Sequence, residues 1–324
     1  MKAIGVRRFG EPGELQSLEL GKPEPGPGQI VVKVWACGLN PVDYKVRKGM
    51  LPLGFAFPLV PGYDISGAVE EVGPGVDAFA PGDEVYYSPE LLPPGGYAEY
   101  HVTEADIVAL KPVGLTHLEA AAVPLAGCTA WQGLFDRAGV EPGDVVLVHG
   151  GAGGVGSLAV QLAAWAGAEV LATAGADNLE YVEDLGASLV VDHAEEDFVE
   201  AVLEATQGRG VDCVLDCVGG ETFLRSFQVL ANGASVVTMV PENLGTLPLE
   251  GLAQAYFKNA DVHFLFMQRR RETLDNLARL LERGYIEPRL EEVIAFDAAR
   301  LAEAHRRLET GHGRGKLVVR VADA

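Results

Sequence analysis

The feature that most constrains this chain is a regular alternation of buried strand patterns and helical patterns between residues 144 and 240. Short β-branched and aliphatic runs predict strands at 145–149, 169–174, 189–192, 213–217 and 235–240. Apolar residues at helical spacing predict helices at 155–165, 179–185, 198–206 and 222–230. Strands and helices that alternate in this way predict right-handed βαβ units around a parallel, doubly wound sheet.

The two ends of the chain have a different pattern. Gly and Pro turns separate predicted strands at 29–36, 65–72, 85–87 and 97–102, which is typical of an antiparallel, barrel-like β domain. Helices are predicted at 117–122, 128–137, 271–282 and 298–308, and a strand at 316–321. We expect this tail to pack on the β domain. The predicted domains are therefore 1–122 with 270–324, β-rich, and 123–269, of the α/β class.

The net charge excludes some partners. The 324 residues carry 46 acidic and 25 basic side chains, a net charge of −21, which argues against binding to nucleic acid or to an anionic membrane. A phosphate site would have to rely on backbone amides and a helix dipole. The N-terminus lacks the apolar run of a signal peptide, and no apolar stretch is long enough to span a membrane, so a cytoplasmic location is expected.

A glycine-rich turn joins the first predicted strand of the alternating region to its helix. Gly151, Gly153 and Gly156 satisfy the G-x-G-x-x-G pattern in the context that this pattern requires. The first glycine allows a tight turn, the second lets a pyrophosphate approach the backbone, and the third lets the helix pack closely. The alternative is a glycine-rich turn without a ligand. The residues predicted to bind the cofactor here are Gly151, Ala152, Gly153, Gly154, Val155 and Gly156.

The end of the second strand bears on which dinucleotide binds. A site for NAD usually carries an acidic residue there, but this strand ends at Ala174 and Gly175. Small residues leave room for a 2′-phosphate and favour NADP. Gly175, Asn178 and His193 are predicted to border this position, with His193 the nearby candidate cation. Asp177 has the opposite charge, which keeps NAD or dual use open.

Loops after the later strands should also border the cofactor, because ligands lie beyond the carboxyl ends of parallel strands. Val218 follows the fourth predicted strand, and Val240 ends the fifth.

Several separated motifs resemble the medium-chain dehydrogenase/reductase superfamily, and most closely its zinc-independent quinone oxidoreductase and alkenal reductase branch. The motifs are residues 38–45 (GLNPVDYK), 61–67 (PGYDISG), 126–130 (AGCTA), the glycine turn and 315–319 (GKLVV). The resemblance implies a GroES-like β-rich catalytic domain, made from both chain ends, around an inserted Rossmann domain. It also implies a homodimer that pairs through an edge strand near Phe264, Leu265 and Phe266.

The resemblance further implies roles for individual residues. Asn40, Thr129 and Lys316 would lie near the nicotinamide, with Phe264 and Phe266 close by. Tyr63, Lys45 and Tyr44 are candidate catalytic donors toward the substrate oxygen, and solvent is an alternative proton source. Relatives often have Arg at the position of Asp177, where it would face the 2′-phosphate.

The same resemblance predicts that no metal is bound. Zinc-dependent relatives have Cys and His where this chain has Asn40 and Tyr63. Cys37 is out of register by three residues, and residues 86–97 lack the cysteines of a structural zinc lobe. A tetrahedral zinc site needs three or four such ligands. Cys213 and Cys217 are expected on one face of a strand, in the core.

Without a metal, hydride can pass to a carbon that is already electrophilic. Quinones and α,β-unsaturated carbonyls qualify, since conjugation spreads the developing negative charge to oxygen. The sequence therefore predicts an oxidoreductase that uses NADPH, with NADH or dual use as the alternative. Two other possibilities stay open: a reductase of enoyl thioesters, and a nucleotide-binding or sensor protein without catalysis.

Overall fold

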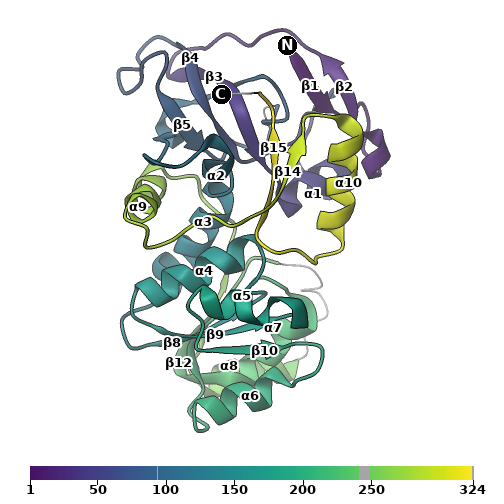
Figure 1. Ribbon diagram of the computed structural model, residues 1–324. Helices are drawn as coiled ribbons and strands as arrows, with labels where there is room; N and C mark the ends of the chain where they lie inside the picture. Colours follow the sequence, from purple (N-terminus) through teal and green to yellow (C-terminus); the bar gives the residue numbers. More distant parts are fainter. Residues whose placement is uncertain (93, 241–248, 323–324) are drawn as a thin grey trace. The chain divides into compact units, whose positions relative to one another are not determined.

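The computed structural model describes residues 1–92, 94–240 and 249–322. The chain divides into two compact units (Figure 1). Unit 1 comprises Met1–Cys128 and Gln268–Ala324, and unit 2 comprises Thr129–Met267.

Unit 2 is built on a parallel sheet in which the described residues form six strands, ordered β10-β9-β8-β11-β12-β13. The strand order reverses between β8 and β11, which is the topology of a Rossmann domain. The strands are β8 (Val145–His149), β9 (Glu169–Ala174), β10 (Leu189–Asp192), β11 (Val211–Asp216), β12 (Leu230–Thr238) and β13 (Asp261–Phe264). The α-helices are α4 (Gly154–Trp165), α5 (Leu179–Asp184), α6 (Phe198–Ala205), α7 (Gly220–Ser226) and α8 (Leu249–Phe257).

The strands of unit 2 consist mainly of apolar residues because the sheet is buried. Leu147, Leu171 and Val214 are at most 1% exposed and belong to one hydrophobic cluster. Burial on both faces is what gives parallel strands continuous Val, Ile and Leu runs rather than an alternation. This explains why the three strands 145–149, 169–174 and 189–192 were predictable to the residue.

Several predicted boundaries in unit 2 are wrong, among them both ends of the fourth and fifth strands. β11 ends at Asp216, so Cys217 lies beyond the strand and does not share a strand face with the buried Cys213. A helix was predicted up to residue 230, but α7 ends at Ser226 and a short 3-10 turn, Phe227–Val229, follows. Leu230 instead opens β12, because it pairs with Val211 in the sheet.

Unit 1 contains a seven-stranded sheet, with β14-β15-β3-β4-β5-β7 in order and β6 paired to β3, and a separate β1-β2 pair; both are counted over the described residues. The strands are β1 (Lys2–Gly5), β2 (Gln16–Glu19), β3 (Gln29–Gly38), β4 (Ile65–Val72), β5 (Glu84–Tyr87), β6 (Tyr100–Glu104), β7 (Ala109–Leu110), β14 (Leu290–Ala295) and β15 (Lys316–Arg320).

Both ends of the chain meet in this sheet. β15 pairs antiparallel with β3, with Val318 opposite Gly38 and Val319 opposite Cys37. The prediction that the tail packs on the N-terminal β domain is confirmed. The arrangement is the GroES-like fold expected from the resemblance.

The helices of unit 1 are α1 (Pro41–Lys48), α2 (His117–Ala120), α9 (Arg271–Glu282) and α10 (Ala298–Glu309), with α3 (Pro124–Trp131) at the point where the units divide. The helix predicted at 128–137 begins earlier, as α3, and continues as a π-helical segment, Gln132–Arg137. α1 was not predicted. It starts after Asn40 with Pro41 at its first position, where proline is favoured, and ends at Gly49, whose φ is +72°.

In the described part of the chain, no helix has the length and the apolar composition needed to cross a membrane.

Candidate functional site

The glycine turn connects β8 to α4 in unit 2. The Gly151 N–H donates to Thr173 O at 2.9 Å, and the Gly153 N–H donates to Gly150 O at 3.0 Å. α4 begins at Gly154, with Gly153 as its N-cap residue. The first N–H groups of a helix have no partner within the helix, and together with the helix dipole they favour an anion at this position.

The glycines of this turn differ in what surrounds them. A Cβ on Gly156 would lie 2.1 Å from Gly150 O, so a side chain is excluded by the protein itself. A Cβ on Gly151 would lie 3.0 Å from Val182, which is a tight contact. A Cβ on Gly153 would meet only Gly150 O, at 3.4 Å. The protein leaves room at Gly153, and a ligand that approaches the backbone would use that room.

A buried histidine, His149, is hydrogen-bonded to a side chain that holds the glycine turn. His149 Nδ1 lies 3.2 Å from Thr173 Oγ1, and His149 Nε2 lies 3.1 Å from Ser226 Oγ. Ser226 donates its own proton to Thr222 O, so its oxygen accepts from His149 Nε2–H. His149 Nδ1 then accepts from Thr173, whose oxygen accepts from Gly150 N–H. Burial lowers the pKa of His149 to about 3, so the ring is neutral.

The end of β9 is bordered by the residues that the sequence predicted. The Asn178 N–H donates to Gly175 O at 2.8 Å, and a Cβ on Gly175 would lie 3.7 Å from His193 Nε2. His193 and Asp177 are both exposed. The structure therefore brings Gly175, Asn178 and His193 together, with Asp177 on the same short 3-10 turn, Ala176–Asn178.

A buried carboxylate organises the loops after β11 and β12. Asp216 Oδ1 accepts from the N–H groups of Val218 and Gly219, at 3.0 and 2.9 Å, and its Oδ2 accepts from Thr238 Oγ1 at 2.7 Å. A Cβ on Gly219 would lie 2.8 Å from Val240 Cγ1, so the two loops are in contact. Val218 is half exposed. Both predicted loop residues thus lie in one place, held by an aspartate that the sequence analysis did not single out.

In unit 1, Asn40 and Lys316 belong to one buried polar cluster with Asp64. Lys316 Nζ donates to Leu39 O at 2.8 Å, to Asn40 Oδ1 at 2.6 Å and to Asp64 Oδ2 at 2.9 Å. Asn40 Nδ2 donates to Asp64 Oδ2 at 2.8 Å, and the Leu125 N–H donates to Asp64 Oδ1 at 2.6 Å. Burial raises the pKa of Asp64, and the Lys316 ammonium opposes that rise. All three ammonium hydrogens are used, so Lys316 acts by orienting Asn40.

The three predicted donors have different surroundings. Tyr63 is fully buried, and its hydroxyl donates to Leu91 O at 3.1 Å. Burial raises the pKa of Tyr63 further above its ordinary value. Tyr44 and Lys45 are half-buried on α1, where Lys48 Nζ lies 5.9 Å from the centre of the Tyr44 ring.

The remaining predicted residues lie in unit 2. Thr129 is buried near the end of α3, and the π-helical segment Gln132–Arg137 follows that helix. Phe264 ends β13, the outermost strand on its side of the described sheet, and is 53% exposed; Phe266 follows it and is 70% exposed. These two side chains make the strand end apolar and accessible.

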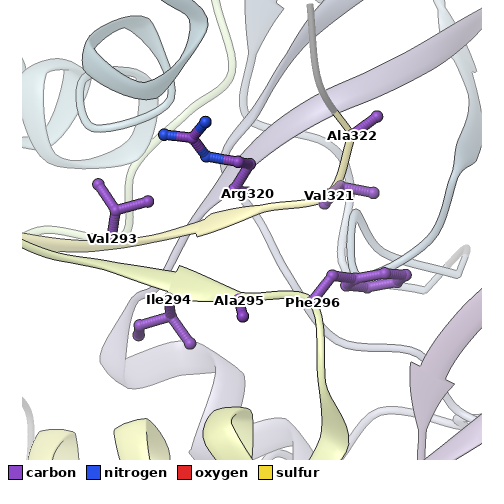
Figure 2. Close-up of a pocket in the computed structure, with 7 residues that line it drawn as sticks. All are labelled: Val293, Ile294, Ala295, Phe296, Arg320, Val321 and Ala322. Carbon is purple, nitrogen blue, oxygen red and sulfur yellow. The ribbon is translucent and has the colours of Figure 1, made fainter.

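A shallow hollow of about 440 Å³ lies at the edge of the unit 1 sheet, beside β14 and β15. Figure 2 shows its lining residues, in which Arg320 is the one charged side chain among aliphatic and aromatic groups. It contains no acid, base or nucleophile that could carry a reaction. It also shares no residue with the predicted site, so we assign it no role in catalysis.

Several residues that organise these regions have no local sequence signal. Asp216, Thr173 and Ser226 are far apart in the sequence, and each has a role only through its partner in the fold. Asp64 could have been found, because it follows the predicted Tyr63 in the motif at 61–67. A buried carboxylate needs hydrogen-bond donors or a cation beside it. Lys316, which was predicted to lie in the same site, is the cation that Asp64 binds.

The comparisons with known proteins agree with this geometry. A family model described as "Alcohol dehydrogenase GroES-like domain" matches residues 26–113, and one described as "Zinc-binding dehydrogenase" matches residues 185–319. The human quinone oxidoreductase is 30% identical, over 98% of this chain and 97% of its own. The 2-methylene-furan-3-one reductase of Solanum lycopersicum is 36% identical, over 98% and 79%.

A solved structure of the quinone oxidoreductase from Coxiella burnetii has a TM-score of 0.89 and 36% identity, and covers 99% of both chains. A structure described as an NAD-dependent alcohol dehydrogenase has a TM-score of 0.92 and 36% identity, over 99% of this chain and all of its own. The fold and these matches together define the class of this protein: it is a dinucleotide-dependent oxidoreductase. The chain belongs to the medium-chain dehydrogenase/reductase superfamily, in its quinone oxidoreductase branch.

One family model carries zinc in its description, so we tested whether this chain's residues fit the metal. In the described residues, no group of three or more His, Cys, Asp or Glu side chains is placed to hold a metal ion. Where zinc-dependent relatives have Cys, Asn40 is hydrogen-bonded to Lys316, and an ammonium group repels a divalent cation. Burial raises the pKa of Cys37 well above its ordinary value, which disfavours the thiolate that zinc needs. The residues do not fit zinc.

Proposed function

We propose that this protein is a zinc-independent reductase that passes hydride from NADPH to a quinone or an α,β-unsaturated carbonyl compound. The observation that carries the proposal is the glycine turn. The protein's own backbone fills the space beside Gly156, whereas the space beside Gly153 is left for a ligand. Relatives whose names are quinone oxidoreductase and 2-methylene-furan-3-one reductase support the substrate class.

The chain's own residues would bind and orient the cofactor. The backbone N–H groups at the start of α4 would hold the pyrophosphate, and Gly153 would let it approach. Asn40 and Thr129 would meet the nicotinamide, with Lys316 and Asp64 fixing the Asn40 amide. The bound nicotinamide supplies the hydride; orientation and exclusion of water are what the protein adds.

The choice of substrate follows from the missing metal ligands. Oxidation of a saturated alcohol needs a group that stabilises an alkoxide, which zinc supplies in many enzymes. A quinone or enal spreads the negative charge over its own conjugated system. A hydrogen-bond donor is then sufficient for its oxygen.

We assign the proton donor to α1. The Tyr63 hydroxyl donates its hydrogen bond to Leu91 O inside the core. Tyr44 and Lys45 are half-buried and so remain in reach of a ligand or of solvent, which can supply the proton as well. Of the three predicted donors, these two suit the role better.

The preference for NADPH over NADH rests on the end of β9. Ala174 and Gly175 leave space where an acid would bind a 2′-hydroxyl, and His193 lies beside Gly175. Asp177 opposes the preference, so NADH is expected to bind as well, with lower affinity.

The proposal includes a homodimer. β13 is the outermost strand on one side of the described sheet, and the exposed Phe264 and Phe266 lie at its end. An edge strand with apolar side chains pairs readily with another strand. Sedimentation of the purified protein tests this: two chains per particle is the expected result.

The experiment for the activity has two parts. NADPH at 100 times its dissociation constant should stabilise the fold by about 2.7 kcal/mol. Loss of the reduced nicotinamide absorbance should then follow addition of a quinone or an enal, and should survive dialysis against a chelator. Absence of stabilisation by both NADPH and NADH would overturn the dinucleotide site. Loss of activity on chelation, restored by zinc, would overturn the metal-free chemistry.

A further inference from the structure

A second buried hydrogen-bond system in unit 1 begins and ends on α1. It runs from Arg47 through His305 of α10 and Tyr97, in the segment before β6, to Asp43. All four side chains have no exposed surface. We call these four residues the relay. No role was predicted for any of them from the sequence.

The direction of every bond in the relay is fixed by the chemistry of its ends. An arginine can only donate, so Arg47 Nη1, 3.2 Å from His305 Nδ1, makes that nitrogen an acceptor. The proton of the neutral ring therefore lies on Nε2, which donates to the Tyr97 oxygen at 3.2 Å. The Tyr97 hydroxyl in turn donates to Asp43 Oδ2 at 2.8 Å.

The relay is not a path for protons. A proton could move between Asp43, Tyr97 and His305, but Arg47 closes the outer end because its guanidinium stays protonated in proteins. Burial lowers the pKa of His305 to about 3, and the Arg47 charge adds to this, so the ring is held neutral. The relay is therefore a fixed row of dipoles that points at the Asp43 carboxylate.

The outer end of the relay is anchored to two other segments. Arg47 Nε donates to Gly10 O at 3.1 Å, and Arg47 forms an ion pair with Glu309 of α10. Lys48 pairs with the same Glu309. Figure 1 shows α1 and α10 side by side, as these contacts require. Arg47 is thus held by Gly10 and Glu309 as well as by His305. Its guanidinium therefore stays in place if the bond to His305 is removed.

The inner end of the relay fixes Asn40. Asp43 Oδ2 also accepts from the Asn40 N–H, at 2.8 Å, across the first turn of α1. A carboxylate at this position also interacts favourably with the helix dipole. Lys316 and Asp64 hold the amide of Asn40, while Asp43 holds its backbone. Asn40 is therefore fixed from both sides.

Asp43 depends on the relay for its charge. Burial raises the pKa of Asp43 to about 7, while the bonds from Asn40 and Tyr97 lower it. Asp43 Oδ1 has no hydrogen-bond partner among the described residues. Removal of the Tyr97 hydroxyl would take away one of the two hydrogen bonds that Asp43 Oδ2 accepts, from Asn40 N–H and from Tyr97. The carboxylate would then bind a proton more readily and hold Asn40 less firmly.

We propose that Tyr97 and His305 are positioning residues for hydride transfer, which act by holding Asp43, and through it Asn40, in place against the nicotinamide. This inference rests on the proposed function, because it assigns Asn40 to the nicotinamide. It concerns the rate of the chemical step rather than the affinity for the cofactor, since no relay residue touches the glycine turn that would bind the pyrophosphate.

The test compares three relay variants with a matched control. Tyr97→Phe removes one hydroxyl, and His305→Leu removes both ring nitrogens. His305→Gln keeps an acceptor for Arg47 and a donor for Tyr97. Tyr87→Phe is the control, because Tyr87 is also fully buried in unit 1 and its hydroxyl lies 2.9 Å from a buried histidine, His101, outside the relay.

The readouts are the single-turnover rate of hydride transfer from NADPH to an enal, the dissociation constant of NADPH and the melting temperature. Tyr97→Phe and His305→Leu should lower the hydride-transfer rate about 10- to 100-fold, as small misplacements of reacting groups do. The dissociation constant should stay unchanged. His305→Gln should recover most of the rate, and Tyr87→Phe should keep the parent rate even if it melts earlier.

Three results would overturn the proposal: a rate for Tyr97→Phe equal to that of Tyr87→Phe, no recovery in His305→Gln relative to His305→Leu, or a rate loss matched by weaker binding of NADPH. If the parent protein itself transfers no hydride, the proposed function fails, and this role of the relay fails with it. A normal parent rate with an unaffected Tyr97→Phe variant would overturn the relay alone.

Discussion

The two units differ in the chemistry that they offer to a cofactor. Unit 2 offers backbone: between Thr129 and Met267 the chain has four basic residues, Arg137, Arg209, Arg225 and Lys258, against twenty acidic ones. Of these four, Arg209 pairs with Asp212, and Arg225 pairs with Asp197. An anion is therefore met by N–H groups and the helix dipole rather than by a cluster of cations.

Unit 1 offers buried side chains instead. Lys316, Asp64, Arg47 and Asp43 are charged or titratable groups inside the core, each held by several partners. The difference teaches that the phosphate end of a dinucleotide can be recognised by chain geometry alone, whereas groups around a reacting centre need side chains fixed by a network. The first kind of site is one run of consecutive residues, whereas the residues of the second are spread over separate segments of the chain.

The largest effect should come from the buried network of unit 1. Lys316→Met leaves the Asp64 carboxylate buried without its cation, so the free energy of unfolding should fall by about 3–5 kcal/mol. Denaturant titration measures this. Lys33→Met, which removes an exposed lysine from β3 of the same sheet, is the control. A loss below about 1 kcal/mol, the value of a surface ion pair, would contradict the network.

The next effect distinguishes two glycines of unit 2. Gly156→Ala should destabilise the fold by about 1–3 kcal/mol or more, because its Cβ would lie 2.1 Å from Gly150 O. Gly153→Ala should leave the melting temperature near that of the parent and weaken NADPH binding, because its Cβ meets space reserved for the ligand. Equal melting temperatures for the two variants, or unchanged binding by Gly153→Ala, would contradict this assignment.

A smaller effect is expected at the end of β9. Asp177→Arg replaces a repulsive charge with an attractive one beside the predicted 2′-phosphate, and should shift the ratio of NADPH to NADH affinity about tenfold toward NADPH, or about 1.4 kcal/mol. His193→Ala should move the ratio in the opposite direction. Titration of both cofactors measures the two ratios. If neither variant changes its ratio, the 2′-position does not lie at Gly175 and His193.

The smallest effect compares buried histidines in the two units. The pKa values of His149 and His305 are lowered to about 3, and that of His101 to about 4, whereas unfolded histidines bind protons near pH 6.5. Between these limits the unfolded state binds more protons at each of these histidines, so their contribution to stability should fall as the pH falls below about 6.5. Each histidine contributes at most about 1.4 kcal/mol per pH unit.

His149→Gln should remove its share of that slope, as measured by denaturant titration at several pH values. The exposed His312→Gln should leave the slope unchanged. A slope that is the same in His149→Gln and in the parent would show that His149 is not buried neutral beneath the glycine turn.

The comparison also explains what could be predicted from the sequence. β8, β9 and β10 were predicted to the residue because their burial in a parallel sheet leaves short runs that are mostly aliphatic. The glycine turn was recognisable because its residues are consecutive. The tail strand β15 and its return to the β domain were also predicted, and the pairing of Val318 with Gly38 confirms that the tail packs on that domain.

Other parts could not be predicted, for a physical reason. The relay joins Asp43 to Tyr97, 54 residues along, and Arg47 to His305, 258 residues along. No local pattern reports contacts of that range. α1 was missed because its eight residues, PVDYKVRK, carry few apolar positions, and its start depends on the Asn40 N–H bonding to Asp43.

The transfer of a label from cofactor to product tests the central claim most directly. The chelator-treated protein is supplied with NADPH carrying deuterium at the transferable position and with an α,β-unsaturated ketone, and the product is examined by mass spectrometry. The account predicts a saturated ketone with one deuterium on the carbon β to the carbonyl. A product without deuterium, or oxidation of the bound NADPH by neither this ketone nor a quinone, would contradict it.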